Sequence, residues 1–238
     1  GNCQIDLGDN PAAELSLQSA RACFPGAPAN QAGIVNSLAL VLRYRGRSRE
    51  AADSFLVAYN LYLRARASIP SLSNLRASAG VCMNLGSAYL DQRAFPGALF
   101  YFQKALDLYL DLPQSAPDLA ACYDKIGQVH LAQGNLEATS EAWDLAFSLA
   151  PKGPPGLRFA VWLHRGDWQG RQQLWEAALA SYQSALAIVS PPGPRAAVLY
   201  PYESVQVRAS ISRLWLTRSR QSGQKADWEK TLTAARDA

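Results

Sequence analysis

The chain has 238 residues, of which 49% are hydrophobic and 18% are charged, and its formal net charge is +4. This globular composition excludes wholesale disorder, and the length suffices for one or two domains. Ala and Leu dominate while Val and Ile are sparse, and no long stretch alternates apolar and polar residues, so the composition favours helices over strands.

The expected helices follow one another along the chain, separated by Gly and Pro. The first is expected at about 10–23. Four pairs follow at about 31–45 and 48–66, 73–92 and 95–112, 116–133 and 136–149, and 157–172 and 175–189. A tail rich in Arg, Lys, Gln and Ser predicts a last pair at about 196–220 and 225–237.

Four helix pairs share one internal spacing. A small residue on the first helix is followed 12 positions later by a second small residue, then four later by an aromatic residue, then three later by Ala. We expect the small residues to let the two helices approach closely and the aromatic side chain to fill the space that remains. The positions are Ala39, Ala51, Phe55 and Ala58; Gly86, Ala98, Phe102 and Ala105; Gly127, Thr139, Trp143 and Ala146; and Gly166, Ala178, Tyr182 and Ala185.

This pattern resembles the tetratricopeptide repeat, although Thr139 and Gln169 depart from its usual Ala and aromatic residue. The repeats are longer than the family's usual length of about 34 residues. Units of about 40 residues resemble the subgroup of kinesin light chains, Leu-Gly-Asn-rich polarity adaptors and bacterial peptide-sensing regulators. The resemblance implies an all-α fold, a right-handed α-solenoid of antiparallel helix pairs, with the first helices lining a concave face.

The resemblance divides the chain into three segments. Residues 1–30 are expected to be the second half of a truncated first repeat, because Gly8, Ala13, Ala20 and Pro25 match that half. Residues 31–194 are expected to hold four repeats, and residues 195–238 to form capping helices with a polar outer face. The opening half repeat and the missing initiator Met suggest a piece of a longer polypeptide.

Catalytic and metal chemistry is not expected. No nucleophile–base or phosphate-binding motif occurs, and His130 and His164 lie far apart. No pair of cysteines has C-x-x-C spacing, the usual spacing of zinc ligands. From these observations together we expect no metal, no cofactor and no enzyme activity. The cysteines are Cys3, Cys23, Cys82 and Cys122.

The remaining composition bears on partners and location. The basic clusters at 43–49 and 208–225 are interpreted as solvated faces, with a surface for an anionic partner as the alternative. No nucleic-acid recognition motif accompanies them. The sequence has no apolar run of about 18 residues, which argues against membrane insertion. Thiols that are expected to be reduced favour a cytoplasmic location.

A candidate binding face follows from the segment Asn84-Leu85-Gly86. In the families resembled, an Asn at this place hydrogen-bonds the backbone of a bound peptide, and mostly polar residues occupy the neighbouring positions of the other first helices. Amides would satisfy an extended peptide backbone while charges select its side chains. The candidate residues are Asn36, Leu40, Arg43, Asn84, Ser87, Asp91, Lys125, Gln128, His164, Asp167 and Arg171.

The sequence thus predicts an interaction module that binds a protein or an extended peptide in its concave groove, within a longer adaptor or regulatory protein. The alternative is a sensor domain whose ligand switches an attached effector. The tail at about 218–238 is a candidate to fill the groove itself.

Overall fold

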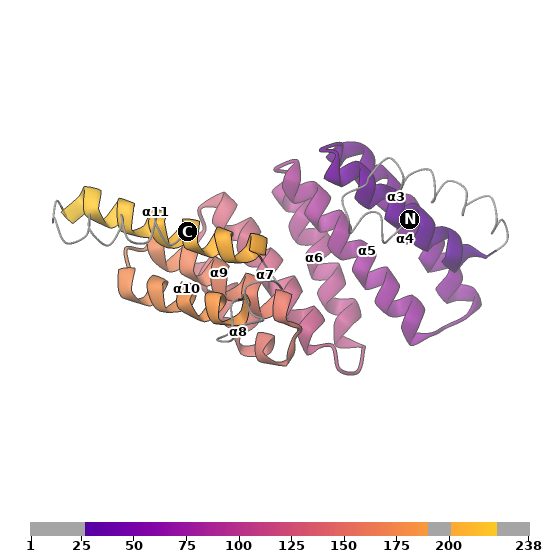
Figure 1. Cartoon of the computed structure of the whole chain (residues 1–238). Coiled ribbons are helices and arrows are strands. Elements are labelled where there is room, and N and C mark those ends of the chain that lie inside the picture. The colour runs from indigo at the N-terminus through magenta and orange to yellow at the C-terminus, as the bar shows by residue number, and fades with distance from the viewer. Residues whose placement is uncertain (1–26, 190–200, 223–238) are drawn as a thin grey trace. The chain divides into compact units, whose positions relative to one another are not determined.

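The computed structural model describes residues 27–189 and 201–222, and all regular secondary structure in these ranges is helical (Figure 1). The expectation of an all-α fold is confirmed. The helices expected at 10–23 and 225–237 lie outside these ranges, as does most of the tail proposed to fill a groove. None of the described helices combines the length and the hydropathy that a bilayer-spanning segment requires.

The eight paired helices begin and end within three residues of their expected bounds. They are α3 (Pro28–Tyr44), α4 (Ser48–Ser68), α5 (Leu72–Asp91), α6 (Phe95–Leu110), α7 (Ala116–Gln133), α8 (Leu136–Leu149), α9 (Pro155–Arg171) and α10 (Trp175–Val189). A short 3-10 helix, η1 (Ala150–Lys152), precedes α9. The tail helix α11 is described over Pro201–Ser222, and its expected start at about 196 lies outside the described residues.

Local sequence signals explain several helix ends. The side chain of Ser71 accepts a hydrogen bond from the backbone N–H of Asn74 at 3.1 Å, which caps the start of α5. Gly134 ends α7 with a φ of 77°, a left-handed conformation that residues with a Cβ adopt rarely. Proline in the first turn of α3, α6, α7 and α9 starts each helix without losing a backbone hydrogen bond.

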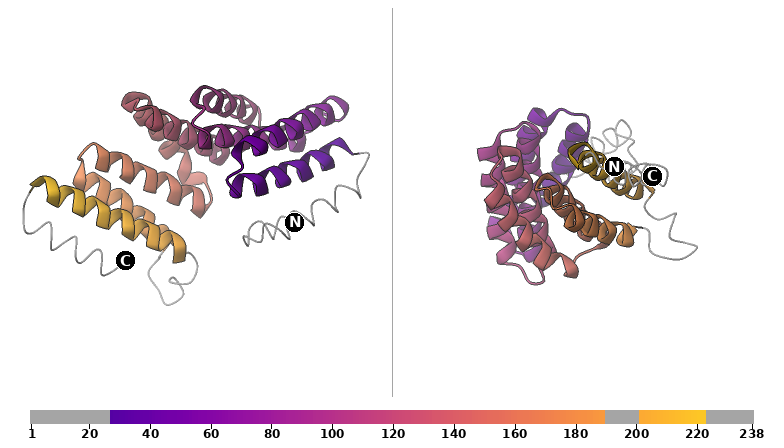
Figure 2. Two further views of the ribbon diagram at one scale, coloured as in Figure 1. Left: turned by 90° about the horizontal axis from the view of Figure 1, so that it is seen from above. Right: turned by 90° about the vertical axis from the view of Figure 1, so that its left-hand side faces the viewer.

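The chain divides into two compact units, Gly1–Ala142 and Trp143–Ala238. In the first unit, α3 packs on α4, α4 on α5, α5 on α6 and α6 on α7. In the second, α9 packs on α10, and α11 runs alongside both (Figure 2). Each unit has its own hydrophobic core.

Close contact between a glycine and an aromatic ring joins the helices of a pair, as the spacing predicts. A Cβ added to Gly86 would lie 2.5 Å from Cε1 of Phe102. A Cβ added to Gly166 would lie 2.6 Å from the ring of Tyr182. In both pairs the absence of a side chain lets the aromatic ring lie flush against the facing helix.

Candidate functional site

The first helices of three successive pairs, α3, α5 and α7, are neighbours in the first unit, since α5 contacts both of the others. An amide pair joins α3 to α5: Nδ2 of Asn84 donates a hydrogen bond to Oδ1 of Asn36 at 2.9 Å. Both side chains are half-buried. Asn84 therefore lies beside a second amide on the neighbouring helix.

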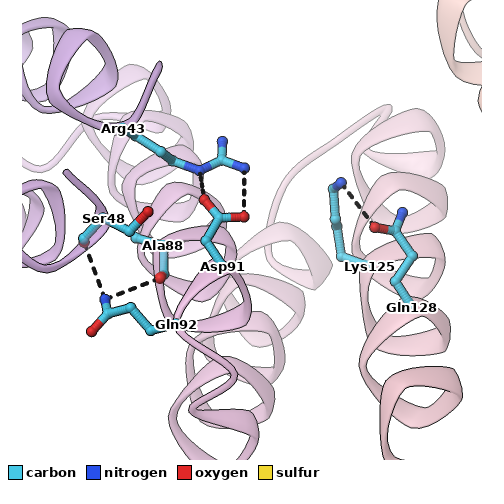
Figure 3. A network of polar contacts seen from close by, with 7 residues as sticks. All are labelled: Arg43, Ser48, Ala88, Asp91, Gln92, Lys125 and Gln128. Carbon is cyan, nitrogen blue, oxygen red and sulfur yellow. Dashed lines mark hydrogen bonds and ion pairs between the residues drawn. The ribbon is translucent and has the colours of Figure 1, made fainter. Parts of the chain in front are cut away.

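An ion pair joins the same two helices nearer their C-terminal ends. Nε of Arg43 lies 2.6 Å from Oδ2 of Asp91, and Nη2 of Arg43 lies 3.5 Å from Oδ1 (Figure 3). The side chains keep 25% and 37% of their surface exposed, so solvent screens the pair. Its main effect is to fix the orientation of the guanidinium, with donors left over for other acceptors.

The amide of Gln92 ties the end of α5 to the beginning of α4. Its Nε2 donates to the backbone oxygen of Ser48 at 3.1 Å and to that of Ala88 at 3.0 Å (Figure 3). Both carbonyl groups thereby accept a side-chain hydrogen bond near the Arg43–Asp91 pair. This arrangement anchors the end of α5 from which Asp91 projects.

The side chains on α7 continue the polar contacts. Nζ of Lys125 donates to Oε1 of Gln128 at 3.3 Å, and Nε2 of Gln128 donates to Oδ2 of Asp124 at 2.8 Å. Figure 3 shows Lys125 and Gln128 on the helix beside the one that carries Asp91. Burial lowers the pKa of Lys125, and the nearby positive charge of Arg43 acts in the same direction, while Asp124 and Asp91 oppose them.

We call the side chains of these three pairs the polar face; they are Asn36 with Asn84, Arg43 with Asp91, and Lys125 with Gln128. All six were among the residues expected from the sequence. Of the other two candidates in the first unit, Leu40 packs against the hydrophobic core and Ser87 is buried. Leu40 and Ser87 therefore pack beneath the polar face and offer little exposed surface to a partner.

The three remaining candidates lie in the second unit. The ring of His164 stacks on Trp143, with centroids 6.1 Å apart and planes inclined by 13°. Oδ1 of Asp167 accepts a hydrogen bond from the Tyr182 hydroxyl at 2.6 Å, and Arg171 lines a pocket with both residues. Burial first, and then the Asp167 carboxylate, raise the pKa of Tyr182, so this hydroxyl stays protonated and donates.

Two side chains outside the expected set take part in these contacts. Asp124 holds Gln128 from four residues earlier on α7, and its place one helical turn from the packing pair Ile126-Gly127 marks it in the sequence. The sequence marks Tyr182 as a packing residue, and nothing in its spacing signals the hydrogen bond from its hydroxyl to Asp167.

Metal ligands and reactive thiols do not gather in the described part of the chain. No group of three or more His, Cys, Asp and Glu side chains there could hold a metal ion. Cys82 and Cys122 are free and buried, and burial raises the pKa of the Cys82 thiol to about 12. Both are packing residues of the first core, as expected.

Known structures share this fold at low sequence identity. BtubC (BKLC) from P. vanneervenii superposes with a TM-score of 0.69 at 12% identity, over 95% of this chain and 85% of that chain. The pilF protein from Pseudomonas aeruginosa superposes with a TM-score of 0.53 at 16% identity, over 98% of this chain and 93% of that chain. No curated protein sequence matches the chain.

A family model described as Tetratricopeptide repeat matches residues 78–112. These residues include most of α5 and all of α6, the pair in which Gly86 contacts Phe102. Over these residues the chain matches a tetratricopeptide repeat (TPR), and the solved structures above share the fold of the chain. In TPR terms, α5 and α6 are the first and second helices of one repeat, and the polar face lies on the first helices.

Proposed function

We propose that this protein is an interaction module and that its polar face binds an extended segment of a partner protein. The main support is that three neighbouring first helices bear paired amide and charged side chains, which contact one another and are partly exposed to solvent. TPR folds generally act as non-catalytic scaffolds for protein interaction, which supports the same proposal. A place within a longer adaptor or regulatory polypeptide in the cytoplasm is part of the proposal.

The amide pair is suited to a peptide backbone. Each Asn side chain has two N–H donors and a carbonyl oxygen with two lone pairs. The Asn84–Asn36 hydrogen bond uses one donor of Asn84 and one lone pair of Asn36, so both amides keep groups for a ligand. An extended peptide alternates N–H and C=O groups and could bond to the two amides in succession.

Lys125 indicates the charge of the partner. Its ammonium group is half-buried and near the positive Arg43. The carboxylates of Asp124 and Asp91 also act on it, but its hydrogen bond is to the neutral amide of Gln128 at 3.3 Å. A carboxylate on the partner would compensate the buried charge, since a buried ion is stabilised mainly by an opposite charge with good geometry. We therefore expect the bound segment to carry Asp or Glu where it passes α7.

A peptide selection tests this function. A library of unstructured peptides is panned on the immobilised 238-residue chain, and the affinities of the enriched peptides are measured by titration calorimetry. Asn36→Ala with Asn84→Ala should weaken binding by about 5- to 150-fold, because each lost bond to a backbone group contributes about 0.5–1.5 kcal/mol and two are lost. The control, Asn60→Ala, removes an exposed amide from α4 and should leave the affinity unchanged.

Two results would contradict the proposal. One is a selection that enriches no peptide sequence. The other is an enriched peptide that binds the double variant as tightly as the unaltered chain while both show the same circular dichroism. A loss of acidic residues among peptides selected with Lys125→Met would separately support the assignment of the carboxylate to Lys125.

A further inference from the structure

A pocket of about 240 Å³ opens in the second unit, between α9, α10 and α11. Its size is just below the range of about 300–1,000 Å³ that is usual for drug-sized ligands, so it suits a small molecule or a single side chain. Its principal lining residues come from all three helices: Asp167, Arg171, Trp175, Tyr182, Ser210 and Arg213.

Close packing of buried residues forms the inner wall. Tyr182 and Leu214 are 3% and 6% exposed. Gly170 has no side chain, and a Cβ there would lie 2.9 Å from Cδ1 of Leu214, so this glycine lets α11 approach α9. The Tyr182 hydroxyl donates to Asp167 at 2.6 Å, which holds that carboxylate at the wall. The inner wall of the pocket is therefore in place before any ligand binds.

Three donor side chains of this pocket are unengaged. Within residues 27–189 and 201–222, Arg171 and Arg213 form no ion pair or hydrogen bond through their side chains, although both charges act on Tyr182. The hydroxyl of the buried Ser210 likewise has no partner in those ranges. By contrast, Arg218 on the same helix pairs with Glu176 at 2.6 Å outside the pocket lining.

The charges in the pocket determine what it can bind. Two guanidinium groups and one carboxylate leave one net positive charge, which matches a ligand with a single negative charge. A phosphate group carries close to two negative charges at neutral pH and would lie beside the Asp167 carboxylate, which repels it. Guanidinium groups and a hydroxyl are the donors that bind a carboxylate with directed, charge-assisted hydrogen bonds. The indole of Trp175 adds an apolar wall for the carbon atoms next to it.

We propose that this pocket binds one carboxylate group, held by Arg171, Arg213 and Ser210 beside the Trp175 indole. The carboxylate belongs either to a small free acid or to an acidic side chain of a partner protein. The proposal does not depend on the polar face, because all its residues lie in the second unit. Either can fail while the other stands.

The test is an NMR titration of the whole 238-residue chain, observed at the indole N–H of Trp175 and assigned with Trp175→Phe. The probes are butyrate, the peptide acetyl-Gly-Glu-Gly-amide and its neutral counterpart acetyl-Gly-Gln-Gly-amide. Both carboxylate probes should produce saturable shifts, and the neutral peptide should not. The tighter carboxylate probe identifies the source as a free acid or as a protein side chain, and each result supports the pocket.

Variants of the exposed arginines make the test specific. Arg213→Gln and Arg171→Gln should each weaken carboxylate binding at least tenfold, because each removes a charged donor with little change in size. Arg220→Gln removes an exposed charge of the same helix outside the pocket lining and should have no effect. Circular dichroism of each variant checks that its helices are intact.

Three outcomes would overturn the proposal. The first is equal binding of the Glu and Gln peptides. The second is unchanged carboxylate binding in Arg171→Gln and Arg213→Gln while both remain helical. The third is tighter, Arg213-dependent binding of inorganic phosphate than of either carboxylate probe.

Discussion

The substitution Gly86→Ala should destabilise the first unit, although Ala normally favours a helix. The added Cβ would lie 2.5, 2.6 and 2.9 Å from Cε1, Cδ1 and Cγ of Phe102. Ordinary contacts to a Cβ begin at about 3.4 Å, so the ring or the helix must move by nearly 1 Å. Phe102 is fully buried with Ala98 and Val129, which leaves the ring no free space.

Two opposing terms set the size of the effect. Replacing Gly by Ala inside a helix stabilises it by about 0.8–1.0 kcal/mol. Overpacking a tight core costs about 1–3 kcal/mol, and three close contacts with the ring indicate the upper part of that range. The net effect should be a loss of about 1–2 kcal/mol in the free energy of unfolding.

Hydrogen exchange of α5 and α6 amides, together with urea unfolding followed by circular dichroism, measures this loss where it arises. The matched control is Gly80→Ala on the same helix, where the nearest atom is Oη of Tyr109 at 3.9 Å. It should stabilise the chain by about 0.5–1 kcal/mol. The reasoning is refuted if Gly86→Ala stabilises the first unit as Gly80→Ala does.

Three further predictions concern the side chains of the first unit. A double-mutant cycle of Arg43→Ala and Asp91→Ala, measured by urea unfolding, should give a coupling free energy of about 0.2–1 kcal/mol. This coupling free energy should decrease in 1 M salt, because the ion pair is partly exposed. A coupling free energy that does not change with salt would contradict the prediction. The pKa of Lys125 is lowered in the folded chain, so the unfolded state binds more protons between the folded value and about 10.4, and the free energy of unfolding should rise with pH over that interval. Lys125→Met should remove that rise, and an unchanged difference between variant and parent from pH 7 to 10.5 would count against it. Burial raises the pKa of the Cys82 thiol to about 12, so at pH 8 this thiol should react with a disulfide reagent only as fast as the first unit opens. The measurement compares the reaction rate of the parent chain with that of Cys82→Ser in increasing urea; the part of the rate that is due to Cys82 should rise with urea.

The order and bounds of the helices could be predicted because their signals are local. Pro at helix starts and the left-handed Gly134 at the end of α7 act through their own backbone. The spacing of Gly86 and Phe102 also predicted how the two helices of a pair pack together. A small residue and an aromatic ring at this fixed separation meet across two antiparallel helices.

The candidate site was predictable in part. Asn36 and Asn84 were found from their place on the first helices, yet the sequence could not show that they bond to one another, because that depends on the offset between α3 and α5. The pocket residues Ser210 and Arg213 lie on α11, whose sequence fits the repeat poorly, so no repeat position singled them out. The assignment of residues 31–194 to four repeats and of 195–238 to a cap stays a prediction.

The most direct measurement for the central claim is an NMR map of the binding surface. The 15N-labelled chain is titrated with the tightest peptide from the selection, and shifts are followed for backbone amides and for the side-chain amides of Asn36 and Asn84. We predict the largest changes on α3, α5 and α7, including both Asn side chains. Changes confined to α4 and α6 would contradict the claim that the polar face binds the partner.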